Sequence, residues 1–410
     1  MAFRRSSRPV RCSLPMIHTV AKAIAILGTA LAVSGMGYFL ACLWSARVYL
    51  ADRCSPGLAS DGEGGSKLPP VSILKPLKGV DPEIYESFRS HCLLDYPDYE
   101  VIFGVSEPDD PAVQTVRRLQ REFPQRRIQL IVCSQNLGAN RKVSNLIQML
   151  RVARHDCLIV DDSDIRVQTD YLRHVVAPLA DPAVGMVTCL YRGMPGPTLG
   201  SRLESLGIST DFAAGVLVAR FLEGGLRFGL GSTLAFRRVD LQAIGGFESL
   251  VDHLADDYEL GKRIAALGRR VVLSEVVVDT FLPPYDFKEF LQHQLRWGRA
   301  IRDSRPWGYF GLLFTFGLPW ALLTVIASRG AYWAWGLLGA TLLLRLAVVL
   351  VVGKGVLGDP QVLRLLPLVP LRDGIAALVW IASFLSNTIS WRGDSFVLKD
   401  GKLIRTGTPS

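Results

Sequence analysis

The chain has 410 residues, of which 49% are hydrophobic, and its 46 basic and 37 acidic residues give a formal net charge of +9. That length suffices for one large domain or two ordinary ones, and the apolar fraction is higher than a purely soluble protein needs. A basic chain can bind nucleic acid. However, the sequence has no basic stripe interleaved with aromatic residues, no helix-turn-helix and no RNA-binding signature, so nucleic acid is excluded as a partner.

The N-terminal region, residues 1–54, contains an uncharged apolar run from Ala23 to Trp44. About 20 apolar helical residues cross the hydrocarbon core of a bilayer, so the run predicts a transmembrane helix at residues 23–44. A cleaved signal peptide is the alternative, but the run is long and no clear small-residue cleavage site follows it. Residues 55–68 are rich in Gly, Ser and Pro and are predicted to be a linker.

Between residues 69 and 290, short apolar runs rich in β-branched residues alternate with helix-length stretches. The runs are Val71–Leu77, Tyr99–Ser106, Ile128–Val132, Cys157–Val160 and Gly185–Tyr191. This alternation predicts an α/β domain with a mostly parallel sheet. Ligands of such sheets bind outside the carboxyl ends of the strands, so the polar residues that directly follow the runs are candidates for a site.

Three aspartates follow the fourth run within the sequence Asp161-Asp162-Ser163-Asp164. Residues two apart on an extended backbone face the same side, so Asp162 and Asp164 can converge on one point. Two unpaired carboxylates there would repel each other, and a hard divalent cation removes that cost. Mg²⁺ takes one or two carboxylates and leaves its other positions to water and phosphates. The pattern therefore predicts a Mg²⁺ or Mn²⁺ site for a sugar nucleotide, with an Asx-turn or a helix N-cap as the alternative.

Further polar residues lie near the same predicted edge. After the second run, Asp109 and Asp110 can accept hydrogen bonds from a base or a ribose, unless one of them caps the next helix. Lys142 follows the third run, where phosphates would lie, or is a solvated lysine at a helix start. Asp256 and Asp257 precede a helix with apolar periodicity. One would cap that helix, and the other can act as a general base if its pKa lies near working pH.

Residues 291–307 are predicted to form an amphipathic segment at the membrane interface. His293 and Arg296 stand three residues apart and therefore share a helix face, with Trp297 beside them. The guanidinium of Arg296 can hold a diphosphate through two parallel hydrogen bonds. A helix that only places its basic side chains at the interface is the alternative, and both interpretations can hold together.

Residues 308–390 are predicted to form a C-terminal transmembrane or interfacial region. Its longest apolar runs are Tyr309–Ser328 and Ala331–Gly353, the second of which contains a single charge, Arg345. A third run, Gly374–Ile389, is short enough to span the membrane, re-enter it or lie in its interface. Buried core helices would explain any one of these runs, but their clustering favours the membrane.

Seven motifs occur in one order along the chain: VSILKPLKGVDP, LDYPDYEV, DDPA, DSDIRV, DDY, LRW and NTISWRG. With them the chain resembles the ceramide glucosyltransferase family over roughly residues 70–395, which leaves most of a predicted tail, residues 391–410, outside. The resemblance implies a GT-A fold, with an α/β, Rossmann-like nucleotide-sugar-binding domain at residues 69–290 and α-helical transmembrane segments at both ends. The segments GANRKVSNLIQML, VTCLYRG and LADDYELG are most similar to the bacterial hopanoid-biosynthesis branch of that family.

The resemblance also implies roles for individual residues. Asp257, with Asp256 beside it, would be the catalytic base, and Asp162 and Asp164 would hold the metal and the diphosphate. The other implied donor-binding residues are Pro76, Lys78, Asp109, Asp110, Lys142, His293, Arg296 and Trp297. His293 departs from the family pattern, because the motif (Q/R)xxRW has Gln or Arg at that position. A histidine makes the phosphate contact dependent on pH.

These features predict an inverting, metal-assisted transfer of a sugar from a UDP-sugar to a hydroxyl of a membrane lipid. In the hopanoid branch the donor is UDP-N-acetylglucosamine and the acceptor is bacteriohopanetetrol. Ceramide glucosylation from UDP-glucose is the nearest alternative. A processive polysaccharide synthase is a second alternative, and a sugar-lipid transporter or binding protein without turnover is a third.

The predicted location is the bacterial inner membrane, which the chain crosses several times, with the catalytic domain in the cytoplasm where nucleotide sugars occur. Four arginines before the first span predict the opposite orientation: Arg4, Arg5, Arg8 and Arg11. By the positive-inside rule they would keep the N-terminus in the cytoplasm and put the domain outside. A start at Met16 would remove them, and the substrate argument is given more weight than the charge count.

Overall fold

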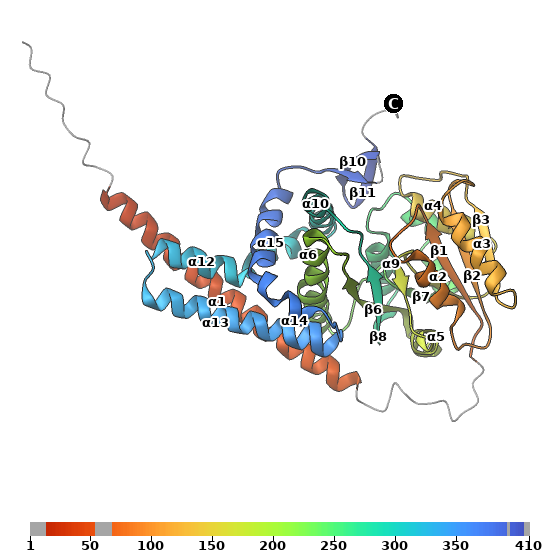
Figure 1. Cartoon of the computed structure of the whole chain (residues 1–410), viewed down its shortest axis with the longest axis horizontal. Coiled ribbons are helices and arrows are strands. Elements are labelled where there is room, and N and C mark those ends of the chain that lie inside the picture. The colour runs from red at the N-terminus through yellow and green to blue at the C-terminus, as the bar shows by residue number, and fades with distance from the viewer. Residues whose placement is uncertain (1–13, 54–67, 392–393, 406–410) are drawn as a thin grey trace, which may run out of the picture.

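The computed structural model describes residues 14–53, 68–391 and 394–405. It has three parts: an α/β domain built on an eight-stranded sheet, a group of long apolar helices beside it, and a small three-stranded sheet near the C-terminus (Figure 1). The predicted linker, apart from Leu68, and the four N-terminal arginines lie outside the described residues.

The large sheet has the strand order β3-β2-β1-β4-β7-β6-β8-β5. Its strands are β1 (Val71–Leu77), β2 (Tyr99–Val105), β3 (Arg127–Val132), β4 (Cys157–Val160), β5 (Ile165–Arg166), β6 (Val184–Met194), β7 (Leu234–Arg237) and β8 (Arg270–Phe281). The five predicted strands are confirmed, but the sheet is mixed rather than mostly parallel. β3, β2, β1 and β4 are parallel, whereas β7 is antiparallel to both its neighbours and β5 is antiparallel to β8. The two antiparallel strands were missed because β5 has only two residues and the apolar part of β7 is only Leu234–Phe236.

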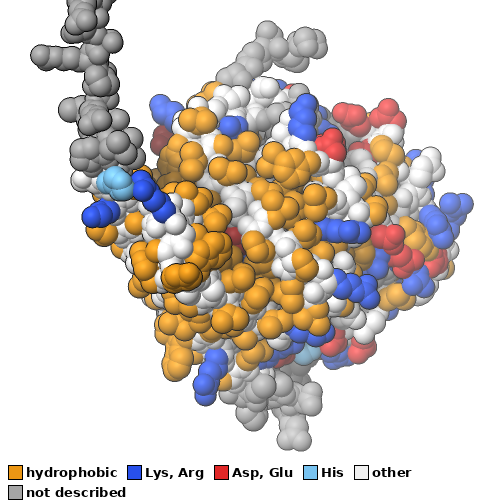
Figure 2. Space-filling model, turned by 60° about the vertical axis from the view of Figure 1, so that its left-hand side comes forward, with side chains coloured by type: hydrophobic (Ala, Val, Ile, Leu, Met, Phe, Trp, Pro, Cys, Tyr) orange, Lys and Arg blue, Asp and Glu red, His pale blue; other side chains and the backbone are white. Residues whose placement is uncertain are grey.

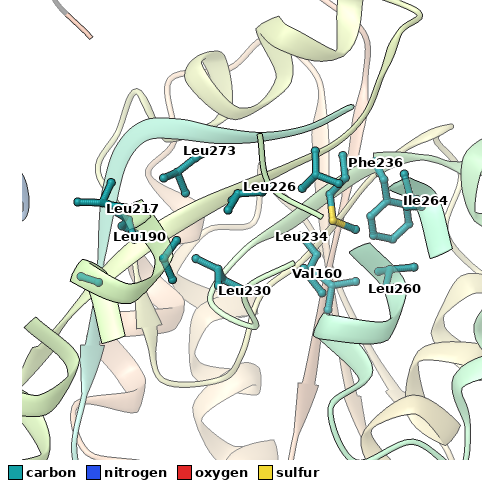
Figure 3. Packing of buried hydrophobic residues seen from close by; sticks show 14 of the residues in the cluster. Val160, Leu190, Leu217, Leu226, Leu230, Leu234, Phe236, Leu260, Ile264 and Leu273 are labelled. Carbon is teal, nitrogen blue, oxygen red and sulfur yellow. The ribbon is translucent and has the colours of Figure 1, made fainter. Parts of the chain in front are cut away.

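Helices cover both faces of this sheet. They are α2 (Ile84–Cys92), α3 (Ala112–Glu122), α4 (Arg141–Leu150), α5 (Tyr171–Val176), α8 (Arg238–Ala243) and α9 (Asp256–Ala266), with short 3₁₀ turns at η1 (Ala177–Ala180) and η3 (Phe247–Leu250). One buried cluster joins α2, α3 and α5 to one face, and a second joins α4, α8 and α9 to the other. Figure 3 shows the second cluster, in which Leu260 and Ile264 of α9 pack beside Phe236 of β7.

The remaining helices form the apolar part of the molecule. They are α1 (Leu14–Arg53), α6 (Leu199–Gly207), η2 (Ile208–Phe212), α7 (Ala213–Leu222), α10 (Phe287–Ser304), α11 (Pro306–Gly311), η4 (Leu312–Phe314), α12 (Gly317–Ala327), α13 (Tyr332–Val348), η5 (Val349–Val356), α14 (Val362–Leu365), η6 (Leu366–Leu368) and α15 (Val369–Ser383). Two of these, η2 and η5, are π-helical turns: η2 joins α6 to α7, and η5 continues α13. Such turns frequently occur at functional sites.

In the described part of the chain, four helices are long and apolar enough to cross a membrane. They are His18–Arg53, Leu199–Leu222, Tyr332–Val356 and Val362–Ser383, and a bent pair, Pro306–Phe314 with Gly317–Ala327, adds a fifth if it counts as one span. The sequence predicted all of these regions except Leu199–Leu222. That helix is 61% buried inside the protein, against 33% for the other three, so it belongs mainly to the packed interior.

Glycines let α1 and α12 approach closely. A Cβ atom added to Gly35 would stand 2.4 Å from the Cα of Gly317, and one added to Gly28 would stand 2.6 Å from Thr324 Oγ1. Small residues at such contacts are the usual means by which membrane helices pack. Gly28 contacts Thr324 late in α12, whereas Gly35, further along α1, contacts Gly317 at the start of α12, so the helices run antiparallel. The start of α1 therefore lies at the same end of the helix pair as the end of α12.

The other end of α1 is part of the α/β domain's core. Phe39, Cys42, Ala46 and Tyr49 belong to the same buried cluster as the sheet, and Tyr49 Oη donates a hydrogen bond to the carbonyl oxygen of Ser274 at 2.8 Å. α1 is therefore a structural element of the domain as well as an apolar helix. In Figure 2 the helical side of the molecule presents a broad apolar face with basic side chains at its margins. Exposed residues of this group include Ile26, Ile326 and Leu343.

The predicted tail, residues 391–410, is in part an ordered sheet. β9 (Thr388–Trp391), β10 (Asp394–Lys399) and β11 (Lys402–Arg405) form a three-stranded antiparallel sheet, called the C-terminal sheet below. Ile389, Phe396, Leu398 and Leu403 are buried under it. The boundary of the predicted C-terminal membrane region at residue 390 therefore falls within a β-strand.

Candidate active site

The carboxyl ends of β3, β2, β1 and β4 lie at one edge of the sheet, because these four neighbouring strands are parallel. The loops beyond them carry Lys78, Asp109 and Asp162, and Lys142 lies in the first turn of α4, which follows β3. Lys78 is exposed just beyond the end of β1. Pro76 is instead buried within β1, where it packs rather than faces a ligand. The edge is the expected place for a ligand of an α/β sheet.

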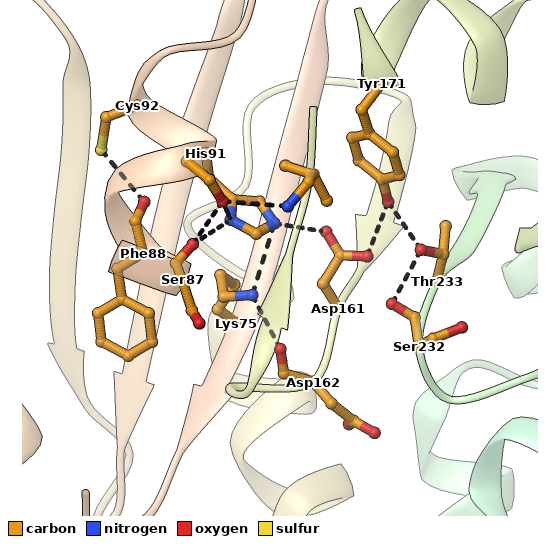
Figure 4. A network of polar contacts seen from close by, with 12 residues as sticks. Lys75, Ser87, Phe88, His91, Cys92, Asp161, Asp162, Tyr171, Ser232 and Thr233 are labelled. Carbon is orange, nitrogen blue, oxygen red and sulfur yellow. Dashed lines mark hydrogen bonds and ion pairs between the residues drawn. The ribbon is translucent and has the colours of Figure 1, made fainter. Parts of the chain in front are cut away.

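The first aspartate of the cluster, Asp161, points into the core. Its carboxylate accepts a hydrogen bond from Tyr171 Oη at 2.8 Å and lies 3.1 Å from His91 Nε2. Lys75 Nζ lies 3.5 Å from the same histidine nitrogen and donates to the carbonyl oxygen of Asp162 at 2.8 Å. Figure 4 shows this fully buried network, which fixes the backbone that carries Asp162.

Burial lowers the pKa of Lys75 and also that of His91, for which the nearby Lys75 is the second cause. The sequence analysis missed these residues. One signal was present, because a lysine in the middle of the apolar run Val71–Leu77 needs a buried partner. That partner comes from a helix and a loop elsewhere in the sequence, and no local pattern identifies it.

Asp162 and Asp164 have different hydrogen-bond partners. Asp162 Oδ1 lies 2.8 Å from Lys142 Nζ, and Asp164 Oδ2 accepts a hydrogen bond from Thr280 Oγ1 at 2.5 Å. Burial, followed by the negative charge of Asp162, raises the pKa of Asp164 to about 7. Asp162 is thus close enough to oppose the ionisation of Asp164.

Lys142 connects two acidic motifs that are far apart in sequence. Its Nζ lies 2.8 Å from Asp162 Oδ1 and 3.2 Å from Asp256 Oδ2. Burial alone would lower the pKa of Lys142, but Asp162 and then Asp256 raise it far above its usual value, so the ammonium stays charged. Asp256 is therefore an ion-pair partner of Lys142. The prediction that Asp256 or Asp257 caps α9 is wrong, because the N-cap is Ala255 and it makes no side-chain hydrogen bond.

Asp257 faces the same small space as Asp162, and Gly231 keeps that space open. A Cβ atom added to Gly231 would stand 3.0 Å from Asp162 Oδ2 and 3.1 Å from Asp257 Oδ2. Burial, followed by the charge of Asp256, raises the pKa of Asp257 to about 6. A carboxylate with such a pKa suits general-base catalysis near neutral pH.

The two aspartates after β2 differ in their surroundings. Asp110 accepts hydrogen bonds from the backbone N–H groups of Gly79, at 3.0 Å, and Ala112, at 2.9 Å. It therefore fixes the loop after β1 to the start of α3, although the N-cap position of α3 is Pro111 rather than Asp110. Asp109 is exposed beside it and is the aspartate open to a ligand.

On α10, one nitrogen of His293 is already used by the protein. Its Nδ1 lies 3.1 Å from Oε1 of Glu204, which is only 1% exposed. The His293 ring packs against Tyr285 and Trp297, with ring centroids 5.4 and 5.1 Å apart. A phosphate contact from His293 would therefore have to use Nε2. Arg296 is half-buried on the same helix. Sequence reasoning missed Glu204, because an acid in the mixed stretch Leu199–Gly207, beside Arg202 and two serines, is an ordinary helix pattern.

These residues fit a divalent cation. Carboxylate oxygens are donors for Mg²⁺ and Mn²⁺, and a dication would relieve the repulsion between Asp162 and Asp164. Among the residues that the structure describes, no group of three or more His, Cys, Asp or Glu is arranged to hold a metal ion. Asp162 and Asp164 would supply part of the coordination shell of such an ion and leave the rest to water and phosphate oxygens, the usual arrangement for Mg²⁺.

The sequence profile of glycosyl transferase family 21 matches residues 27–404. The chain belongs to glycosyl transferase family 21. It is 24% identical to ceramide glucosyltransferase 3 of Caenorhabditis elegans over 391 residues, a match that covers 91% of this chain and 82% of the relative. It is 23% identical to ceramide glucosyltransferase 1 of the same organism, covering 84% of this chain and 74% of the relative.

Among solved structures, the chain is similar to the mannosyltransferase PcManGT from Pyrobaculum calidifontis in complex with GDP-Man and Mn²⁺. The identity is 21%, the TM-score is 0.52, and the match covers 89% of this chain and 99% of that one. The fold is thus the GT-A-like glycosyltransferase fold. The predicted fold class, the predicted ceramide glucosyltransferase-like family and the prediction of a glycosyltransferase are confirmed. The closeness to the hopanoid branch finds no support in these similarities.

Proposed function

We propose that this glycosyltransferase is membrane-bound and moves a sugar from a nucleotide sugar to a hydroxyl of a lipid, with inversion at the anomeric carbon. One observation carries the proposal. Asp162 and Asp257 face one small space beside Gly231, at the ligand-binding edge of a sheet whose core is shared with the long apolar helix α1. Chemistry at that edge is therefore held next to the membrane.

In the proposed reaction, Asp257 takes the proton from the acceptor hydroxyl as that oxygen attacks the anomeric carbon. The nucleoside diphosphate leaves from the opposite face, so no covalent intermediate with the protein is needed. Asp162 and Asp164 would hold Mg²⁺ or Mn²⁺, which supplies electrostatic stabilisation of the leaving diphosphate. Asp109 would contact the nucleoside, and Lys142, Arg296 and Trp297 would contact the diphosphate side of the donor.

The helix packing supports a definite orientation. α1 and α12 run antiparallel, so the start of α1 and the end of α12 lie at the same end of the helix group, which is the end away from the α/β domain (Figure 1). α13 starts at that end and runs back toward the domain. We place the α/β domain on the cytoplasmic side, where nucleotide sugars occur, and the start of α1 on the other side. This orientation gives the active site access to nucleotide sugars. It is the opposite of the orientation that the positive-inside rule predicts from the N-terminal arginines. The assignment to a bacterial inner membrane stays a prediction.

For donor and acceptor we propose UDP-glucose and ceramide. Two relatives that match most of the chain are ceramide glucosyltransferases by name, so this pair is better supported than UDP-N-acetylglucosamine and bacteriohopanetetrol. The latter pair depends on short motifs alone.

The test uses purified full-length protein in lipid vesicles. Ceramide or bacteriohopanetetrol is supplied with UDP-glucose or UDP-N-acetylglucosamine, and with Mg²⁺, Mn²⁺ or a chelator. Glycolipid is scored by mass, and its anomeric configuration by NMR. We expect glucosylceramide with the inverted configuration, and loss of turnover in the chelator. Bacteriohopanetetrol as the better acceptor would replace the proposed substrate pair, and the absence of any glycolipid would reject the function.

Variants test the residues. Asp162→Ala and Asp257→Ala should each abolish transfer while the protein stays folded and membrane-inserted. Asp156→Ala is the matched control, because that carboxylate precedes β4 and its side chain is 92% exposed. It should keep wild-type activity. Substantial transfer by both site variants would reject the assignment of the site.

A further inference from the structure

The C-terminal sheet, β9–β11, packs on the loop that leads to Asp257. Its buried face consists of Ile389, Phe396, Leu398 and Leu403, and this face packs against Leu254 and Ala139. Leu254 stands three residues before Asp257, and Ala139 stands three residues before Lys142. The sheet therefore contacts the two segments that deliver the ion pair and the proposed base to the site.

Backbone hydrogen bonds join β11 to this loop. The N–H of Leu403 donates to the carbonyl oxygen of Asp252 at 2.8 Å, and the N–H of Leu254 donates to the carbonyl oxygen of Gly401 at 3.2 Å. An isolated bridge pairs His253 with Lys402. Residues 252–254 thus run along β11 almost as an added strand, and the chain enters α9 directly afterwards.

The opposite side of the loop is held by Asn140, which is fully buried. Its N–H donates to the carbonyl oxygen of Val251 at 2.7 Å. Its Nδ2 donates to the carbonyl oxygen of His253 at 2.8 Å and reaches Asp256 Oδ1 at 3.3 Å. The loop is therefore fixed between the start of α4 and the C-terminal sheet.

The same sheet is tied to α10, which carries His293, Arg296 and Trp297. The N–H of Gly401 donates to Asp303 Oδ2 at 2.5 Å, and Arg299 Nη1 donates to the carbonyl oxygen of Thr388 at 2.5 Å. Gly401 has φ +77°, a conformation that glycine adopts without strain. One turn of the C-terminal sheet thus bonds both to the loop before Asp257 and to the helix that carries the His293–Trp297 motif.

We propose that the C-terminal sheet is a positioning element for the reaction: it holds the loop 251–254, and with it Asp257, in register with α10. The inference rests on the proposed function of Asp257. In this proposal the residues of the C-terminal sheet act through their contacts with the loop before Asp257 and with α10. Misplacement of a catalytic group by about 1 Å can cost ~100-fold in rate, so loosening this contact should lower kcat well before it unfolds the protein.

The test compares neighbours on β11. Leu403 is 4% exposed and packs on Leu254, whereas Ile404 is 48% exposed on the other face of the strand. Leu403→Ala should lower kcat at least ~10-fold with the KM for the nucleotide sugar within about twofold of wild type, because Asp162 and Asp109 are not moved. Ile404→Ala should keep wild-type kcat. Neither substitution removes a backbone hydrogen bond of β11.

A second pair tests the bond to α10. Asp303→Ala removes the acceptor for the Gly401 N–H and should lower kcat, whereas Asp303→Asn keeps an oxygen at that position and should restore most of it. Hydrogen exchange followed by mass spectrometry gives a readout besides activity. Peptides covering residues 250–260 should exchange faster in Leu403→Ala and Asp303→Ala, and at the wild-type rate in Ile404→Ala.

Unchanged kcat in Leu403→Ala and Asp303→Ala, with faster exchange at residues 250–260, would overturn the proposal, because the loop would be loosened without consequence. A parallel rise in KM and fall in kcat in all four variants would also overturn it, since that pattern indicates general damage. Wild-type protein that transfers no sugar would instead reject the proposed function.

Discussion

Arg345 is the single charge in the predicted apolar run Ala331–Gly353, and the structure gives it four partners on three elements. Its Nε donates to Asp373 Oδ2 at 2.8 Å and its Nη2 to Asp373 Oδ1 at 2.8 Å, in a two-pronged contact with α15. Nη1 donates to the carbonyl oxygen of Thr210 at 3.1 Å, and Nη2 also bonds to Asp211, both on η2. The guanidinium stands 5.7 Å from the ring centroid of Phe39 on α1.

Replacing Arg345 by methionine keeps most of the side-chain length and removes the charge. The guanidinium is 3% exposed and Asp373 is 10% exposed, so Arg345→Met leaves an uncompensated carboxylate out of contact with water. Breaking a buried ion pair from one side costs about 3–5 kcal/mol. With roughly 2.1 cal/mol/K of unfolding entropy per residue, that loss lowers the thermal midpoint of a chain of this size by roughly 4–6 °C.

The double variant Arg345→Met/Asp373→Leu decides whether the cost comes from the orphaned charge. Replacing a whole buried pair by apolar residues is often neutral or stabilising, so the double variant should recover at least ~2 kcal/mol of the loss from the single variant. Thermal unfolding in detergent, followed by intrinsic fluorescence, measures both. Arg364→Met is the control, because that arginine is exposed. A wild-type midpoint in Arg345→Met, or a double variant no more stable than the single one, would refute the reasoning.

Three further predictions concern the site and the helix packing. Burial and Asp256 raise the pKa of Asp257 to about 6. Because the base must be ionised, turnover should fall as pH drops below about 6, whereas an aspartate with an ordinary pKa would keep turnover unchanged down to about pH 4. A turnover rate that does not change between pH 7 and pH 4.5 would exclude Asp257 as the base. The Lys142 ammonium lowers the pKa of Asp257, so Lys142→Met should move the acid limb of the pH–rate profile to higher pH, and a shift to lower pH would contradict the ion-pair geometry. Gly35→Val should destabilise the helix pair by more than the ~1–3 kcal/mol typical of overpacking, because the added atoms meet the backbone of Gly317. Gly37→Val is the control and should be tolerated, since nothing lies within 4 Å of its added Cβ. Equal thermal midpoints for the two variants would contradict this helix packing.

The strands at the ligand-binding edge were predictable because each is a buried parallel strand and therefore a continuous apolar run. Val71–Leu77 and Cys157–Val160 are found with the predicted bounds. β7 and β5 were not predictable in this way, because β5 has only two residues and β7 has only three apolar residues before Arg237. The C-terminal sheet was not predicted from the sequence, for a different reason. Its strands are short and half-exposed, and their stability comes from the loop 252–254, about 150 residues earlier in the chain.

In the site, sequence patterns located loops better than they assigned individual side chains. The alternation of a strand indicated that Asp162 faces the ligand edge, but the same alternation turns Asp161 inward to Tyr171 and His91. Asp109 and Asp110 were equivalent in sequence, and only the backbone N–H groups of Gly79 and Ala112 distinguish them. Such distinctions depend on contacts between distant segments, which one sequence does not specify.

The arrangement of charge explains why the two acidic motifs need each other. Asp162 is held on one oxygen by Lys142, and Lys142 is held by Asp256, so the proposed metal-binding motif and the proposed base motif share one ammonium. That cation stabilises both carboxylates without filling the space beside Gly231, where Asp162 Oδ2 and Asp257 Oδ2 face each other. A dication and a diphosphate that enter this space together have charges that largely cancel. We therefore expect neither motif to rearrange when the donor binds. Because Asp256 is adjacent to Asp257, any movement of Lys142 toward the phosphates would increase the repulsion between these aspartates and raise the basicity of Asp257 at the moment the donor is in place.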